Sequence, residues 1–170
     1  MAAPIYSGGR PFFKGGIRFN NFISFNKTVT GIADDVATTL FTINVPNPAS
    51  GKYVTACMEV LLVTILGAGG GVAVGETATT ATGTIVVTRT PGLAAVIGIS
   101  ALTQTTSCAV AGASASVAAT LTNVAVAGAN TVAQTFAIQT TIDDDTNSAT
   151  NDIAVVFVQC QTSGVPVTFS

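Results

Sequence analysis

The sequence contains no histidine and no tryptophan, and only 8% of its 170 residues are charged. Histidine is the commonest general base and the commonest zinc ligand, so this chain cannot form a Ser-His-Asp or Cys-His site. Outside the first 27 residues the only cations are Lys52 and Arg89, and the only glutamates are Glu59 and Glu76. We therefore expect a protein that is not an enzyme and that needs no cofactor.

Clustered positive charge is also missing. No charged residue occurs in residues 90–142, and the formal net charge is −2. Nucleic-acid binding needs clustered Lys and Arg, and a membrane-spanning helix needs about 20 apolar residues in a row. The most apolar run is interrupted by four glycines in residues 67–71. These features predict neither a nucleic-acid nor a membrane partner.

Cysteine is scarce and unclustered. The three cysteines lie about fifty residues apart and form no CxxC pair. This spacing argues against a disulfide framework or a zinc site, so we expect small hydrophobic side chains within strands at Cys57, Cys108 and Cys160. Residues 143–147, three aspartates followed by Thr and Asn, have oxygen ligands that suit calcium. They lack the glycine and final glutamate of an EF-hand, and a solvated hairpin loop is the simpler interpretation. No metal site is predicted.

Hydrophobic residues are abundant, at 48% of the chain. Disordered chains are charged and poor in aliphatic residues, so the bulk of this chain is expected to fold. A surface with few charges and a low net charge favours association. The composition is therefore typical of a subunit that covers much of its surface with copies of itself.

Residues 1–27 differ in composition from the rest of the chain. They hold six of the eleven aromatic residues and four of the six cations, and no acidic residue. Frequent Gly and Pro disfavour a helix here. We predict an extended N-terminal arm over residues 1–27, with Phe22 and Phe25 beginning the first strand and covering the core. Aromatic residues and Arg are enriched at interfaces, so the predicted partner-binding residues of the arm are Tyr6, Arg10, Phe12, Phe13, Lys14, Arg18 and Phe19.

Residues 28–170 have the pattern of a β domain. Phe41, Ile43 and Val45 alternate with Thr42 and Asn44, and the same period of two recurs in residues 84–88 and 135–142. The runs 60–66 and 153–158 are apolar at nearly every position, which predicts strands packed on one side by the opposing sheet and on the other by a neighbour.

Turn signals separate about eight strands, with a possible ninth. Two packed sheets accommodate this number, and a jelly-roll-like sandwich is preferred to an immunoglobulin-like one. The residues predicted as strands are 22–30, 37–45, 53–66, 82–90, 93–101, 104–111, 114–126, 132–142 and 152–160.

Residues 31–38 and 88–92 flank strands in a manner that resembles phage jelly-roll proteins. With the arm and the uncharged β domain, the chain is similar to small virion proteins of tailed bacteriophages, of the decoration (cement) or head-fibre type. The resemblance implies a homotrimer on the capsid surface that braces the major capsid protein, docked through the arm. It carries over no site residue.

Two other functions remain open. One is a receptor- or glycan-binding spike module, which the absence of Trp and the presence of only two Tyr disfavour. The other is an extracellular filament subunit in which the arm completes a neighbour's sheet by strand donation.

Overall fold

A computed structural model describes residues 21–33, 35–65, 77–109, 118–126, 128–143 and 152–170. It is an all-β protein with two antiparallel sheets, as predicted. The predicted strand positions are confirmed to within a few residues in most cases. The strands are β1 (Asn21–Ile32), β2 (Thr38–Val45), β3 (Val54–Ile65), β4 (Thr77–Arg89), β5 (Val96–Ile99), β6 (Thr103–Ala109), β7 (Ala118–Val126), β8 (Gln134–Asp143), β9 (Asp152–Gly164) and β10 (Thr168–Phe169).

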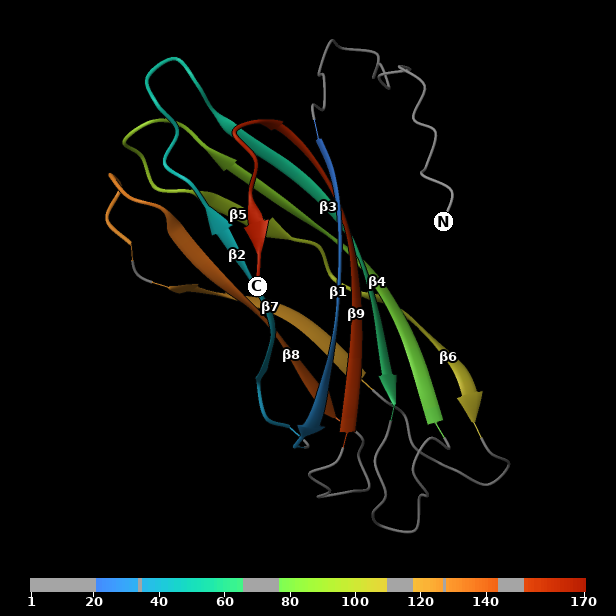
Figure 1. Cartoon of the computed structure of the whole chain (residues 1–170). Coiled ribbons are helices and arrows are strands. Elements are labelled where there is room, and N and C mark those ends of the chain that lie inside the picture. Colours follow the sequence, from blue (N-terminus) through green and yellow to red (C-terminus); the bar gives the residue numbers. More distant parts are fainter. Residues whose placement is uncertain (1–20, 34, 66–76, 110–117, 127, 144–151) are drawn as a thin grey trace, which may run out of the picture.

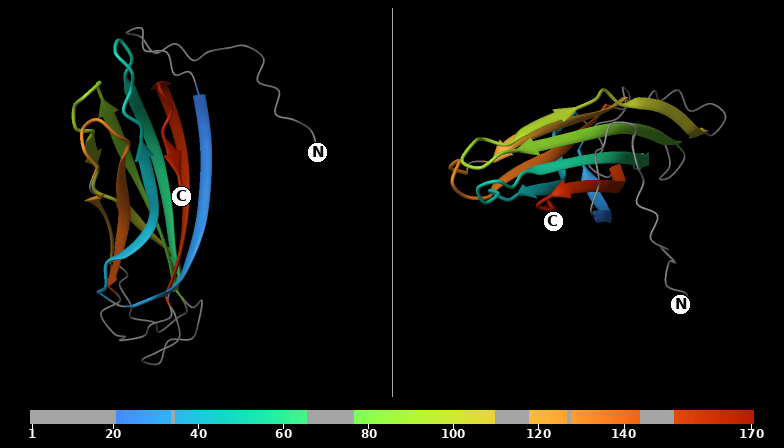
Figure 2. Two further views of the ribbon diagram at one scale, coloured as in Figure 1. Left: turned by 60° about the vertical axis from the view of Figure 1, so that its left-hand side comes forward. Right: turned by 90° about the horizontal axis from the view of Figure 1, so that it is seen from above.

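The two sheets form a sandwich (Figures 1 and 2). The six-stranded sheet has the order β1-β9-β3-β4-β5, with β6 also pairing with β4, and the four-stranded sheet has the order β10-β2-β8-β7. The pair β1·β9 lies in one sheet and the pair β2·β8 in the other, which is the nesting of a jelly roll. The centre departs from that fold, because β3 and β4 form a hairpin within a single sheet.

Alternating side chains of both sheets form one core. Phe41, Ile43 and Val45 on β2 are fully buried, whereas Thr42 and Asn44 point away from the core. Each large buried aliphatic or aromatic side chain stabilises the fold by about 1.5–3 kcal/mol. The predicted alternation of β2 is therefore confirmed, and that of β4 and β8 is confirmed in the same way.

Phe25 is placed as predicted, but Phe22 is not. Phe25 packs on Phe41 and Phe169, with ring centroids 5.6 and 5.5 Å away, and so links β1 to β2 and β10. Phe22 is 51% exposed on the opposite side of β1. The prediction for Phe22 is wrong because residues three apart on a strand point to opposite faces.

Arg89, at the end of β4, is a buried cation that joins the two sheets. Only 2% of its surface is exposed. Its guanidinium donates to four backbone carbonyls: Nη1 to Val45 at 2.8 Å, Nε to Leu93 at 3.0 Å, and Nη2 to Asn130 at 3.0 Å and Val132 at 2.8 Å. Burial lowers the pKa of Arg89. The planar fork of five donors suits a fan of carbonyls that a single ammonium could not span.

The edge of the six-stranded sheet beyond β4 contains a β-bulge. Ile99 on β5 pairs with Ile85, and Thr103 on β6 pairs with Thr82. Residues 100–102 therefore stand opposite only residues 83 and 84, which is the signature of one extra residue in the edge strand. The sequence predicted the two flanking strands without this irregularity.

Candidate functional site

The outer surfaces of the two sheets differ in chemistry. We call the outer surface of the six-stranded sheet face A and that of the four-stranded sheet face B. Five large hydrophobic side chains are exposed on face A and one, Val124, on face B. Face B is otherwise formed largely by Thr, Gln, Asn and Ser. The exposed hydrophobic residues of face A are Phe22, Leu61, Val86, Val96 and Phe157.

Face A is apolar because β3 and β9 carry apolar residues on both sides. The inward residues of these strands are almost all buried, as expected for a sandwich. On the outward side, Leu61 is 38% exposed and Phe157 is 43% exposed. The predicted packing by the opposing sheet is therefore confirmed. The predicted packing by a neighbour stays a prediction, and face A is where that neighbour would lie.

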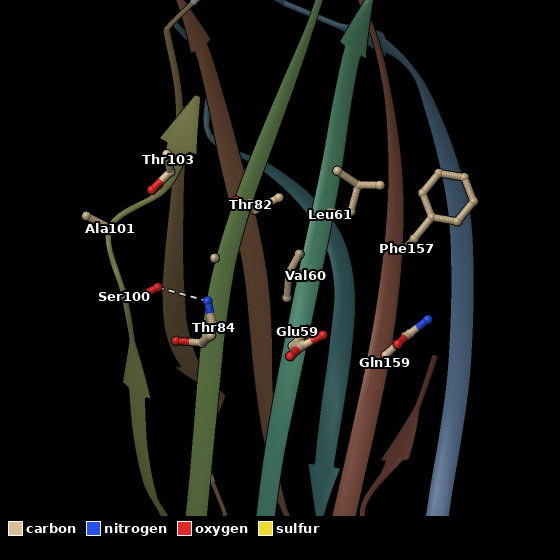
Figure 3. A pocket seen from close by; sticks show the side chains of 11 residues that line it. Glu59, Val60, Leu61, Thr82, Thr84, Ser100, Ala101, Thr103, Phe157 and Gln159 are labelled. Carbon is tan, nitrogen blue, oxygen red and sulfur yellow. Dashed lines mark hydrogen bonds between the residues drawn. The ribbon is translucent and has the colours of Figure 1, made fainter. Parts of the chain in front are cut away.

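A groove of about 650 Å³ crosses the middle of face A. Leu61 and Phe157 are directly paired across β3 and β9, and Glu59 and Gln159 form the next outward pair (Figure 3). Thr82 and Thr84 on β4 continue the floor. The groove combines an apolar pair, one carboxylate, one amide and a row of hydroxyls, and its size lies in the range of ligand pockets, ~300–1,000 Å³.

The β-bulge forms one wall of this groove. The backbone N–H of Thr84 donates to Ser100 Oγ at 2.8 Å, and the Ser100 N–H donates to the Thr84 carbonyl at 2.9 Å. Leu102 packs beneath, since a Cβ on Gly83 would lie 2.8 Å from its Cδ2. The bulge thus holds Ser100, Ala101 and Thr103 along the rim, and it depends on residue 83 having no side chain.

Most residues that the sequence singled out lie elsewhere. All seven predicted partner-binding residues of the arm precede Asn21 and lie outside the described residues; residues 21–27, the last part of the predicted arm, belong to β1. The aspartate-rich segment 143–147 also lies outside them, except for Asp143 at the end of β8.

The cysteines occupy strands, as predicted. Cys57 lies on the outward side of β3, Cys160 is buried on the inward side of β9, and Cys108 belongs to β6. Burial raises the pKa of the Cys160 thiol to about 12, and the nearby Cys57 adds to this shift.

The described segments hold no cluster of three or more metal-ligating side chains. In the same segments no helix is long and apolar enough to cross a membrane.

The sequence missed the groove. Each of its strands was predicted, but their order in the sheet was not, so Leu61 and Phe157 could not be paired in advance. The signal that was present is the doubly apolar character of residues 60–66 and 153–158.

Comparisons with known proteins give no family. No family model matches the chain, and no curated protein matches it. Two solved structures are similar to it. The Acinetobacter baumannii phage AM24 tailspike protein shares 12% identity at a TM-score of 0.48, over 88% of this chain and 28% of that protein. The Acinetobacter phage vB_ApiP_P1 tailspike protein shares 14% identity at a TM-score of 0.34, over 91% and 25%.

The chain therefore spans about a quarter of the length of both tailspike proteins. Both similarities are too low to carry an argument about this chain.

Proposed function

We propose that this protein is a non-catalytic structural module of a bacteriophage virion, and that it self-associates through face A. The observation that supports the proposal most strongly is the exposed Leu61–Phe157 pair at the centre of a face with a single charged residue on its groove, Glu59. Contiguous exposed apolar surface marks interaction sites. The virion setting rests on the resemblance to phage jelly-roll proteins, and a homotrimer on the capsid surface is the assembly that this resemblance implies.

Glu59 on its own does not suit catalysis. Hydrolysis of a glycosidic bond usually employs two carboxyl groups that flank the bond. Among the residues that line the groove, Glu59 is the only ionisable one. A binding or packing role for the groove therefore accords better with its chemistry than an enzymatic one.

The experiment compares the full-length protein with Phe157→Lys. Sedimentation equilibrium should give three copies of the 16.9 kDa chain for the unchanged protein. A lysine placed in an apolar contact loses its hydration, so we expect the dissociation constant to rise about a hundredfold or more. Val124→Lys on face B is the matched control, since Val124 is 47% exposed and Phe157 43%. A monomeric parent protein, or equal masses for the two variants, would overturn the proposal.

A second candidate function is recognition of a saccharide in the same groove. Phe157 offers an aromatic surface beside the Glu59 carboxylate, the Gln159 amide and the hydroxyls of Thr82 and Thr84, which together are groups that can contact a sugar ring. A glycan array probed with the full-length protein and with Phe157→Ala tests it. Signals that disappear in the variant would support this function, and a blank array would reject it.

A further inference from the structure

The groove of face A has a candidate occupant within the chain itself. We propose that residues 1–20 of a neighbouring copy lie along this groove, with their aromatic side chains on Leu61 and Phe157 and their cations near Glu59. This inference deepens the proposed self-association and rests on it. It assigns the arm to a second copy of this chain instead of to a capsid subunit.

Charge is divided between the arm and the rest of the chain. Residues 1–20 contain Arg10, Lys14 and Arg18 and no acidic residue, so their side chains carry +3. The remaining residues contain three cations and eight acids, which gives 3 − 8 = −5, and the two parts sum to the net charge of −2. Opposite charges favour contact between the two parts and guide their encounter. On the groove, Glu59 supplies the negative charge.

The apolar groups of the two parts also match. The groove exposes Leu61 and Phe157, and residues 1–20 supply Phe12, Phe13 and Phe19. Aromatic side chains bury large area at interfaces, and Arg accompanies them there. Glycines at 8, 9, 15 and 16 impose no side-chain bulk between these anchors.

The geometry of β1 directs the arm toward a neighbour. β1 begins at the upper end of the sandwich and runs downward beside β9 (Figure 1). Asn21 pairs with Thr162, whereas Phe157 pairs with Asn26, so the groove lies about 17 Å further along the strand. Residues 1–20 precede Asn21 and would have to reverse direction to reach their own groove. Twenty extended residues span up to ~66 Å, which is ample to reach another copy.

The test uses two full-length variants and their mixture. The arm variant carries Phe12→Ser, Phe13→Ser and Phe19→Ser. The groove variant carries Leu61→Ser and Phe157→Ser. Each alone should self-associate at least tenfold more weakly by sedimentation velocity, while Val124→Ser on face B stays like the parent. When mixed, the intact arm of the groove variant should bind the intact groove of the arm variant and give a heterodimer.

Each result decides a different point. Restored association in the mixture supports the proposal. If only the groove variant dissociates, face A is an interface but the arm binds elsewhere, for example on a capsid subunit, and this inference fails while the proposed function stands. If both variants dissociate and mixing restores nothing, the arm fills its own groove or acts without it, which overturns the neighbouring-copy assignment. If neither dissociates, the proposed function fails as well.

Discussion

Arg89 offers the sharpest test of how the two sheets are held together. Its guanidinium joins the end of β4 to the carbonyls of Val45, Leu93, Asn130 and Val132, at 2.8–3.0 Å. These carbonyls lie at the end of β2, in the turn after β4 and in the turn before β8. The informative perturbation is Arg89→Met, which keeps much of the apolar stem and removes every donor.

The size of the effect follows from the number of bonds. A hydrogen bond to a charged group contributes about 1.5–3 kcal/mol, and a neutral one about 1 kcal/mol. The four carbonyls lie near the end of the sandwich, where water can replace part of what is lost, so the lower figure applies. The sum is about 4 kcal/mol, a large fraction of the ~5–15 kcal/mol by which domains are stable. Arg89→Lys keeps one or two of the bonds and should lose about 2 kcal/mol.

Urea unfolding followed by far-UV circular dichroism measures these losses. All proteins must be compared at one concentration, because self-association adds to the apparent stability. For a chain of this size, 4 kcal/mol corresponds to a fall in melting temperature of about 8–16 °C. Lys52→Met is the control, since Lys52 is an exposed cation at the same end of the sandwich and should change stability by about 0.5 kcal/mol or less.

The graded series keeps the test decisive even if Arg89→Met fails to fold. The expected order of stability is parent and Lys52→Met, then Arg89→Lys, then Arg89→Met. An Arg89→Met protein within about 1 kcal/mol of the control would refute the assignment of Arg89 as the link between the sheets, because four lost charge-assisted bonds exceed that value.

Two further changes test the core and one turn. Because burial raises the pKa of Cys160 to about 12 from 9.0, the unfolded chain loses this proton first. Stability should therefore be complete below pH 9 and fall by about 1.4 kcal/mol per pH unit above it. Urea midpoints of Cys160→Ala should lack this extra slope, and parallel slopes would contradict the burial argument. Gly164 has φ +82°, and a Cβ there would overlap the Tyr53 carbonyl. Gly164→Ala should lower stability by at least ~3 kcal/mol, whereas Gly51→Ala, with φ +75° and open space around it, should lower it by about 1 kcal/mol; equal thermal shifts would argue against the overlap.

Strand positions could be predicted because period-two alternation is a local property. Phe41, Ile43 and Val45 reveal the inner side of β2 without knowledge of its neighbours. Strand order was not predictable, because it depends on pairings such as β1 with β9, which lie more than a hundred residues apart. The ten strands exceed the eight or nine predicted because β10 is too short to leave a pattern.

Side-chain roles were predicted less well where the partner is backbone. In the sequence Arg89 is merely an isolated cation, and none of its four carbonyl partners has a residue type that would reveal the contact. The bulge at residues 100–102 was missed for a similar reason, since it exists only relative to Gly83 and Thr84 on another strand. The doubly apolar runs of β3 and β9 did indicate a two-sided environment, of which the described chain supplies one side.

The edges of the two sheets bear on how far strand addition could proceed. In the described part of the chain, the six-stranded sheet has one long edge, β1 with 12 residues, and its other edge is broken by the bulge at residues 100–102. The four-stranded sheet has β7 with 9 residues at one edge and the 2 residues of β10 at the other. A continuous sheet built by adding strands would therefore end once two sheets had joined. With only 8% charged residues, the chain has little electrostatic protection against fibre growth, and the irregular backbone of its second edges provides a steric limit in its place.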